Sequence, residues 1–476
     1  GNLVRLVLRF RWLVFVGLIG TTVACVMIFG QVKQQFFPAS NTPLFYFEYK
    51  AEQGSSIQST SRDLAVIEDW LLARDDVDTV TTTIGAGLTR YVLTYTPGDS
   101  DPSIGQLVVR ATSADAIPAL RAELDQFAIN ALPWAEVQTK RIIFGPGGGS
   151  DIEARFSGPD PEVLRDLADQ AEDILRDATP LLHTEHVDWR EKVLVTRPVY
   201  AEDRAQAVGI GRSDVADAIA LSTNGITAGT YRERDRLSQV IDGFKVPAEN
   251  AVIERRNRVQ TITVQANVIE GVTPPTVFPQ IRPLIEAIEL PVGYTLEWGG
   301  EFENAGDAQA SLGKQMPLSF GTMLLITILL FGKLRQTAVI WTIVPMAING
   351  AALGLLFSGL AFSFTALLGL LSLSGMLIKN AIVLVEEIDV QKENGLNQHD
   401  AIVTASVSRL RPVVLAAVTT ILGMVPLLAD SFFAAMAVTI MGGLGFASVL
   451  TLIGVPALYH TYLAKERRAD AAAKPA

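Results

Sequence analysis

The sequence predicts an α+β membrane protein in which a polar domain is inserted between the first and second of six membrane-spanning helices. Apolar runs long enough to cross a bilayer occur near the N-terminus and after residue 316. The net charge of −11 divides into +3 for residues 1–30, +2 for residues 317–476 and −16 for the segment between them. That acidic segment shows strand-like and helix-like patterns in alternation.

The composition excludes several classes of protein. Of the 476 residues, 49% are hydrophobic and 19% are charged, and the charged share lies below that of an ordinary soluble domain. The apolar content excludes a disordered chain. The single cysteine, Cys25, excludes an internal disulfide framework and a cysteine-rich zinc module. The negative net charge argues against nucleic acid as a partner, because nucleic-acid binding needs a basic surface.

The first predicted span, Trp12–Gly30, is a run of 19 uncharged residues. As a helix it would cover about 28 Å. Arg5, Arg9 and Arg11 precede it, as in a secretory signal peptide, but the run is too long and no small-residue cleavage site follows. We therefore expect residues 1–30 to form an uncleaved anchor. Five further spans are expected near Pro317–Phe331, Thr337–Leu355, Phe364–Val385, Val413–Leu428 and Met436–Tyr459.

The positions of lysine and arginine predict the orientation. With six spans, both termini lie on one side of the membrane. Basic residues gather on that side: before the first span, between the second and third, before the fifth and after the sixth. The positive-inside rule places the termini, with a tail at 463–476, in the cytoplasm. Residues 31–316 then lie outside, in the periplasm of a Gram-negative cell, and residues 317–462 hold the remaining five spans.

Residues 31–316 contain two similar series of strand, helix and hairpin. The first series is Leu44–Tyr49, Ile57–Ala73, and Val77–Ile84 with Arg90–Thr96; the second is Ile152–Phe156, Pro161–Ala178, and Thr184–Trp189 with Lys192–Thr196. This repeat predicts two ferredoxin-like βαβ subdomains joined by the glycine-rich segment 146–150. A phosphate-binding role for that segment is disfavoured, because no Gly-Lys-Ser/Thr follows it.

A histidine-rich strand invites a metal-site interpretation. His183, Glu185, His186 and Asp188 lie close together in the sequence. On a regular strand, however, positions three apart point to opposite faces, so we expect a surface strand and no metal site. The sequence also shows no Ser-His-Asp or Cys-His arrangement with a supporting context. We therefore expect neither an enzyme nor a cofactor.

A charged side chain interrupts the fourth predicted span. Lys379 lies seven residues before Glu386, and Asn380 lies six residues before it. The lysine is therefore roughly 10 Å inside the membrane. Lysine can snorkel part of that distance to the interface. The other apolar runs contain no acid, so a counter-ion for Lys379 must come from outside these six helices. Because transporters are commonly built from two related membrane halves, this pattern predicts one half of a larger bundle.

A cleft between the two subdomains is the expected place for a substrate. The strand at 152–156 alternates apolar and charged side chains. Its apolar face is expected to pack on a helix, which favours Glu153 and Arg155 as cleft residues. Phe156, and Arg90 in the first hairpin, complete the candidate set.

Four sequence stretches carry a resemblance to a known family. They are "QQFFPAS" after the first span, "PVGYTLEWGGEFE" before the second, "GMLIKNAIVLVEE" in the fourth, and "RLRPVVLAAVTTILGMVPL" in the fifth. Together with the order of spans, they resemble the C-terminal half of a resistance-nodulation-cell division (RND) transporter of the AcrB type, with twelve spans in all. The resemblance implies two porter subdomains, at 38–145 and at 150–200 with 260–310, and a docking insertion at 200–260.

The resemblance also implies a function and partners. It implies proton-driven efflux of drugs or other small amphiphilic compounds across the bacterial inner membrane, by a homotrimer working with a periplasmic adaptor protein and an outer-membrane channel. The N-terminal half would carry paired aspartates that form a proton relay with Lys379. In this sequence Ala416 stands where relatives often carry a relay threonine, so Thr419, Thr420 or a water would have to take its place. Asn380 and Arg409 are the further relay candidates.

Two further departures from the family pattern bear on function. The loop at 85–90 lacks the phenylalanines that line the drug path in the best-known exporters. The stretch "GTYRERDRLSQV" lacks residues that relatives have near 236–237, and the chain begins at Gly1, as a fragment would. Two rival functions remain: a heavy-metal exporter of the same superfamily, and a non-transporting accessory or scaffold protein with an RND-like body.

Overall fold

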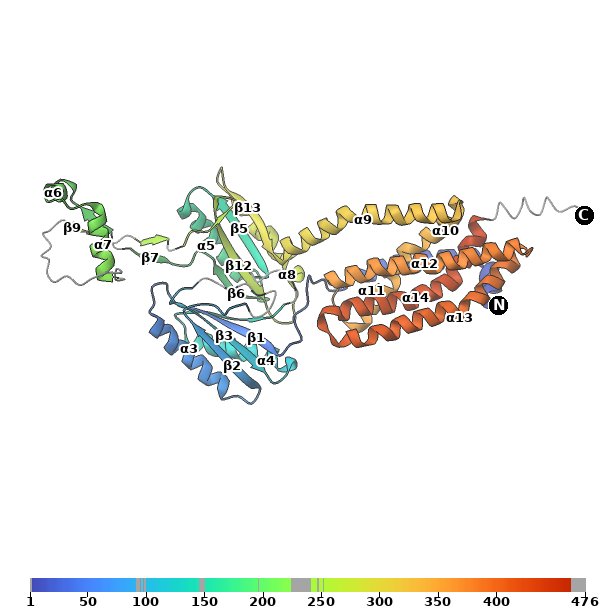
Figure 1. Ribbon diagram of the computed structural model, residues 1–476, viewed down its shortest axis with the longest axis horizontal. Helices are drawn as coiled ribbons and strands as arrows, with labels where there is room; N and C mark the ends of the chain where they lie inside the picture. The colour runs from blue at the N-terminus through green and yellow to red at the C-terminus, as the bar shows by residue number, and fades with distance from the viewer. Residues whose placement is uncertain are drawn as a thin grey trace, which may run out of the picture.

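The computed structural model describes residues 2–90, 95, 97, 100–143, 145, 150–195, 197–223, 241–245, 248–250 and 252–463. The molecule is elongated, with a helical bundle at one end, two sheet-containing subdomains in the middle and a small unit carrying α6, α7 and β9 at the other end (Figure 1). Within the described chain, this arrangement confirms the predicted fold class: an α+β extramembrane domain attached to a bundle of six long apolar helices.

The six predicted spans are confirmed as helices long and apolar enough to cross a membrane. A short helix, α1 (Asn2–Arg9), precedes them. The spans are α2 (Arg11–Phe29), α9 (Glu301–Phe331), α10 with α11 (Leu334–Ile343 and Ala347–Ser358), α12 (Phe364–Glu393), α13 (Gln398–Met424) and α14 (Ser431–Tyr462). A 3-10 turn at Val344–Met346 separates α10 from α11, and another at Val425–Ala429 follows α13.

The bundle is packed around α14, which contacts α11, α12 and α13. Glycines allow the closest approach: a Cβ atom at Gly350 of α11 would lie 2.4 Å from the carbonyl oxygen of Gly442 in α14. The helices α2, α9 and α13 are much less enclosed. Their most apolar windows are only 6%, 6% and 11% buried, against 44% to 56% for the other three spans. Large apolar surfaces of this chain are therefore open to lipid or to further helices.

The first subdomain is a four-stranded antiparallel sheet with two helices. Its elements are β1 (Leu44–Lys50), α3 (Ile57–Leu72), β2 (Val77–Ile84), β3 (Ile104–Ala111), a 3-10 turn (Ala114–Ala116), α4 (Ile117–Ala131) and β4 (Glu136–Arg141). The strand order β2-β3-β1-β4 is that of a ferredoxin-like fold. Phe45, Phe47 and Leu107 alternate inward and are fully buried against Leu64 of α3 and Leu120 of α4.

The second subdomain repeats this topology. Its elements are β5 (Ile152–Gly158), α5 (Pro161–Ala178), β6 (Leu182–Val187), β11 (Arg255–Arg256), β12 (Val259–Val268), α8 (Pro274–Ile285) and β13 (Thr295–Gly300). In its sheet, β12 pairs with β6 and β11 along one edge and with β5 along the other, and β5 also pairs with β13. Asp160 caps α5 by accepting the Glu162 N–H, which starts the helix where the sequence predicted it.

A separate unit leaves the second subdomain between β6 and β12 (Figure 1). It contains β7 (Lys192–Leu194), β8 (Arg197–Tyr200), α6 (Glu202–Ala207), α7 (Arg212–Thr223), β9 (Ile241–Lys245) and β10 (Ala248–Asn250). β7 pairs with β10 and β8 pairs with β9, so two short ribbons connect it to the subdomain. The predicted deletion near 236–237 lies outside the described residues.

Both predicted hairpins have the wrong partners. β2 pairs with β3 at 104–111, and of the predicted strand Arg90–Thr96 the described residues Arg90 and Tyr95 belong to no strand. β6 pairs with β12, and β7 pairs with β10. In both subdomains the second strand of the unit pairs with the third, β2 with β3 and β6 with β12, which follows it after a longer connection than a hairpin turn.

Candidate functional site

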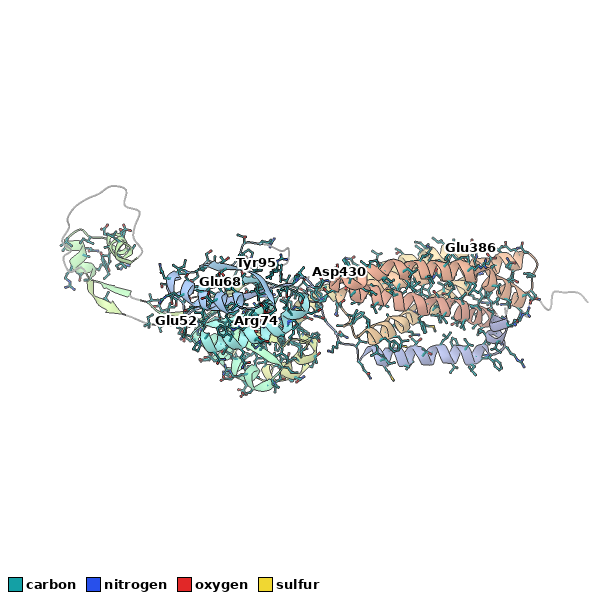
Figure 2. All side chains as sticks on the ribbon, turned by 90° about the horizontal axis from the view of Figure 1, so that it is seen from below. Glu52, Glu68, Arg74, Tyr95, Glu386 and Asp430 are labelled. Carbon is teal, nitrogen blue, oxygen red and sulfur yellow. The ribbon has the colours of Figure 1, made fainter. Side chains whose placement is uncertain are left out.

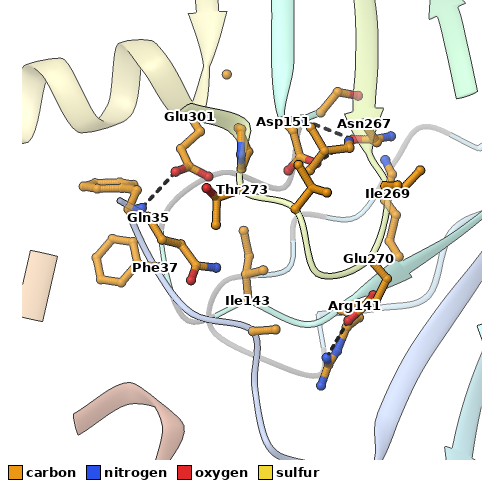
Figure 3. Close-up of a pocket in the computed structure, with 18 of the residues that line it drawn as sticks. Gln35, Phe37, Arg141, Ile143, Asp151, Asn267, Ile269, Glu270, Thr273 and Glu301 are labelled. Atoms are coloured by element: carbon orange, nitrogen blue, oxygen red, sulfur yellow. Dashed lines mark hydrogen bonds and ion pairs between the residues drawn. The ribbon is translucent and has the colours of Figure 1, made fainter. Parts of the chain in front are cut away.

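A cavity of about 690 Å³ lies where the two subdomains meet the membrane bundle (Figure 3). Its walls come from β1 and β4 of the first subdomain and from β5 and the loop after β12 of the second. The start of α9 and the segments at 33–39 and 359–361, next to the bundle, close it on the membrane side. The cavity therefore borders all three parts of the molecule.

Most charged groups in the cavity are paired. Arg155 lies between Glu153 and Glu303, at 2.6 Å and 2.5 Å. Lys140 contacts Glu48 at 3.0 Å within the first subdomain. Two further pairs cross from one subdomain to the other: Arg121 Nη1 lies 2.5 Å and Arg141 Nη1 lies 2.9 Å from the Glu270 carboxylate.

Two carboxylates in the cavity, Asp151 and Glu301, form no ion pair with any Lys, Arg or His in the described part of the chain. Glu301 accepts the backbone N–H of Phe36 at 2.8 Å, and Asp151 accepts that of Val268 at 3.0 Å. The Glu301 N–H donates to the Asp151 carbonyl oxygen at 3.0 Å, so the two residues are neighbours through the backbone (Figure 3). Burial raises the pKa of the Asp151 carboxyl.

The fold brings these two acids together through one strand pair. β13 and β5 are antiparallel with Gly300 opposite Ile152, which sets the residues just beyond them side by side. Gly300 has φ +70°, and a Cβ atom there would lie 2.7 Å from the Asp151 carbonyl oxygen. Only glycine fits this approach, so the Gly-Gly pair before Glu301 positions the carboxylate.

The segment after α2 connects the same site to the bundle. Phe37 stacks on Phe432 at the start of α14, with ring centroids 5.9 Å apart, and also contacts Phe364 at the start of α12. Phe36, whose N–H is held by Glu301, contacts Phe364 as well. The predicted motif "QQFFPAS" thus links the cavity to the ends of two membrane helices.

The predicted cleft residues divide into two groups. Glu153 and Arg155 line the cavity. Phe156 does not: it is fully buried in the core of the second subdomain, on the opposite face of β5, so its side chain packs against the subdomain's own core. Arg90 is exposed, donates from Nε to the carbonyl oxygen of Tyr95, and lies outside the cavity lining.

The two histidines of β6 both face the first subdomain, contrary to the expected opposite directions. His183 Nε2 lies 3.4 Å from the Asp125 carboxylate, and His186 Nε2 lies 3.9 Å from that of Glu136. The physical reason is a bulge: the β6–β12 register shifts between Ala266 and Asn267, so the two histidines lie two pairing positions apart. Among the described residues, no group of three or more His, Cys, Asp or Glu side chains is arranged to hold a metal ion.

The predicted relay residues lie on α12 and α13. Lys379 is exposed on α12 and forms no ion pair or hydrogen bond with described residues, while Asn380 beside it is half-buried. The hydroxyl of Thr419 donates to the Leu415 and Ala416 carbonyl oxygens, and that of Thr420 to Ala416, both within α13. These hydroxyls therefore return to their own helix and make no contact with Lys379.

Arg409 is engaged elsewhere, since its guanidinium donates twice to the Glu387 carboxylate, at 3.0 Å and 2.6 Å. The neighbouring Glu386 lies at the far end of the bundle, and Asp430 lies at its junction with the extramembrane domain (Figure 2). Lys379 therefore stands between these two charged ends, on a face of α12 that this chain leaves uncovered.

The fold, with one span, a paired ferredoxin-like insert and five more spans, matches half of a solved pump structure. The sequence profile of the AcrB/AcrD/AcrF family matches residues 1–245 and 236–462. The chain belongs to this family, which is one of RND transporters and not of enzymes.

Known relatives and solved structures agree with this assignment. The chain is 24% identical to the cobalt-zinc-cadmium resistance protein CzcA of Cupriavidus metallidurans, over 95% of this chain and 47% of that protein. It is 23% identical to the swarming motility protein SwrC of Bacillus subtilis, over 94% and 46%. A crystal structure of a heavy metal efflux pump superposes with a TM-score of 0.78 at 20% identity, covering 97% of this chain and 51% of that one.

The chain thus spans about half the length of the curated relatives it matches. Over 49% of its length it is also 30% identical to the nickel and cobalt resistance protein CnrA of Cupriavidus metallidurans, covering 22% of that protein. The predicted superfamily is confirmed. The predicted substrates, drugs and amphiphiles, do not appear in the names of these relatives, and three of the names refer to metals.

Proposed function

We propose that the chain is the C-terminal half of a proton-driven RND exporter of divalent heavy-metal cations. One observation supports the substrate class above the others: the cavity holds two carboxylates, Asp151 and Glu301, that form no ion pair within the described part of the chain, although Lys140 and Arg121 act on Asp151 electrostatically. A cation entering the cavity supplies the missing charge, and the backbone N–H groups already hold both carboxylates in position.

The donor chemistry favours borderline and hard cations. All eight methionines lie in the membrane helices or their ends, and residues 31–315 contain neither methionine nor cysteine. Soft thioether and thiolate ligands, which select copper(I), are therefore absent from this half of the extramembrane domain. Asp and Glu oxygens are accepted ligands of zinc, while sets of carboxylate, carbonyl and water oxygens suit hard divalent cations in general; either kind of cation would keep some water ligands here. Such loose coordination matches a site that must release its cargo.

The amphiphile exporter expected from the sequence receives less support. A site for amphiphiles is mostly apolar and aromatic with a few polar groups. Here the cavity lining combines ion pairs with the tyrosines Tyr46 and Tyr95 and with aliphatic side chains, and two of its aromatic residues, Phe36 and Phe37, contact the bundle. The scaffold alternative is disfavoured by Lys379, because a cation within a membrane-spanning segment costs free energy and a protein that only serves as a scaffold does not need one.

The energy source is inferred from the uncovered face of α12, and the partners are inferred from the family to which the chain belongs. We infer that the N-terminal half covers this face and supplies acids to Lys379, so that protonation of those acids is coupled to movement of the extramembrane domain. In the complete transporter, a homotrimer in the bacterial inner membrane would pass the cation to a periplasmic adaptor protein and an outer-membrane channel.

Uptake of zinc and cobalt into everted vesicles tests the proposal. With the complete transporter and an imposed proton gradient, we expect uptake to fall at least tenfold in Asp151→Asn and in Glu301→Gln. The matched control is Asp307→Asn, an exposed carboxylate of α9 outside the cavity. Ethidium uptake is measured in parallel. Wild-type vesicles that transport ethidium and neither metal would overturn the metal assignment in favour of amphiphiles.

A further inference from the structure

The contact between the two subdomains contains two of the four histidines in the sequence. His183 and His186 project from β6 of the second subdomain toward α4 and β4 of the first. Around them the contact is polar: Asn267 donates to Gln138 at 3.1 Å, and Arg190 donates to Ser103 Oγ at 3.0 Å. We call this contact the seam. A seam held by polar groups can separate without exposing a hydrophobic core.

His186 is the more enclosed of the two imidazoles, with 7% of its surface exposed. Its Nδ1 atom is buried and has no hydrogen-bond partner among the described residues. The charged groups that face it are two acids and two lysines of the first subdomain: Glu48 and Lys50 on β1, and Glu136 and Lys140 on β4.

Those four groups already neutralise one another. Lys50 Nζ lies 3.4 Å from Glu136, and Lys140 Nζ lies 3.0 Å from Glu48. A neutral imidazole fits this balanced set. A protonated one adds a third cation to two carboxylates that each have a lysine, in a place where water is excluded. Burial is accordingly the main reason that the pKa of His186 is lowered, with Lys50 and Lys140 opposing Glu136.

His183 faces a carboxylate that is also occupied. Asp125 accepts the backbone N–H of Thr139 at 3.0 Å and its hydroxyl at 2.7 Å. Arg121, one turn before Asp125 on α4, attracts the same carboxylate electrostatically and forms an ion pair with Glu270.

We propose that the seam is a proton-sensitive contact, which stays closed while His186 is neutral and opens when His186 takes up a proton. This device does not depend on which substrate is carried. The direction follows from linkage: the closed state disfavours the charged imidazole, so it binds fewer protons than the open state, and acidification shifts the population toward opening. The side of the membrane from which a proton gradient is drawn is the more acidic one, and a seam exposed there would sense that gradient directly.

The size of the effect has an upper bound. If only the open state titrates, with an ordinary histidine pKa of about 6.5, the ratio of open to closed rises about tenfold between pH 7.5 and pH 5.5. Distances between spin labels at two exposed sites, Asn130 on α4 and Gln170 on α5, report this ratio. The labels are attached to cysteines in a Cys25→Ser background, with the chain in lipid nanodiscs and the distances measured by pulsed electron resonance.

We expect acidification to raise the population with the longer distance by several-fold in the parent protein and to have little effect in His186→Gln. His399→Gln, which changes a histidine outside the seam, should keep the full response. Lys50→Met provides a second variant, because it leaves Glu136 free to pair with the imidazolium and should abolish acid-driven opening.

Three outcomes would overturn the proposal. They are a parent protein whose distances do not change with pH, a shorter distance at pH 5.5, and a response that survives unchanged in both His186→Gln and Lys50→Met. None of these distance measurements involves transport. A failure of the seam proposal can therefore be distinguished from a failure of the proposed metal export, which is detected by the uptake assay.

Discussion

Replacing Lys379 with methionine should have opposite effects on stability and on transport. In the chain alone the lysine is exposed on α12 and has no partner among the described residues. A lysine at the centre of a membrane helix costs about 2.5–3.5 kcal/mol. Lys379 lies roughly 10 Å from the end of the apolar segment, within partial reach of the interface by snorkelling, so about half of that cost applies. We expect Lys379→Met to stabilise this chain by about 1–2 kcal/mol in lipid.

In the complete transporter the same change should abolish proton-driven export while assembly is retained, because the cation that the missing half must neutralise is gone. Unfolding of the chain in bicelles measures the first effect, and metal uptake by everted vesicles measures the second. Lys333→Met is the matched control, since it removes a lysine at the bundle's edge and should leave both quantities near those of the parent. Destabilisation of the chain by more than 1 kcal/mol, or normal uptake, would refute the reasoning.

Three further predictions test the two parts of the fold. Burial raises the pKa of Asp188 to about 6, so its negative charge lowers the stability of the folded state, and this loss appears as pH rises from about 4 to 6. In thermal melts, Asp188→Asn should therefore stabilise the extramembrane domain by about 1–3 kcal/mol at pH 7 and should have no effect at pH 4. Gly350→Ala should destabilise the bundle by about 1–3 kcal/mol, because its Cβ would meet the backbone of α14, whereas Gly445→Ala meets nothing within 4 Å and should be neutral. A cysteine at the exposed Asn130 should react with an impermeant maleimide from outside the inner membrane, and reaction from the cytoplasmic side alone would reverse the predicted orientation.

Much of the architecture could be predicted because its signals are local. Uncharged runs mark the six spans, and the amphipathic period marks α3 and α5 to within one residue of their bounds. The strand partners could not be predicted in the same way. A loop rich in glycine at 85–87 suggested a hairpin with Arg90–Thr96, but β2 pairs with β3, the next strand of the structure, which begins only at Ile104.

The site was only partly predictable, because its main residues are far apart in the sequence. Alternation along β5 correctly placed Glu153 and Arg155 on the face away from the core. Asp151 and Glu301 were missed, although the glycines before Glu301 gave a signal of close backbone approach. Only the β5–β13 register shows that the two acids meet. The direction of His183 depended on a bulge, which leaves no mark in a strand pattern.

A reversible cross-link across the mouth of the cavity tests whether movement of the subdomains carries the substrate. Glu270 of the second subdomain holds Arg121 and Arg141 of the first, so this cluster closes the cavity on one side (Figure 3). In the complete transporter, cysteines at 141 and 270 joined by a reducible bismaleimide should stop metal uptake, and reductant should restore it.

The double cysteine variant without the cross-linker is the control for loss of the ion pairs themselves, because it removes both the Arg141–Glu270 and the Arg121–Glu270 pair. The Glu270 side chain is 38% exposed, so we expect these losses to cost at most about 1 kcal/mol each and to leave uptake within a few-fold of the parent. A cross-linked protein that transports at the control rate would show that the subdomains act as a fixed channel. The alternating opening of a cleft, and with it any transport role for the seam, would then be wrong for this protein.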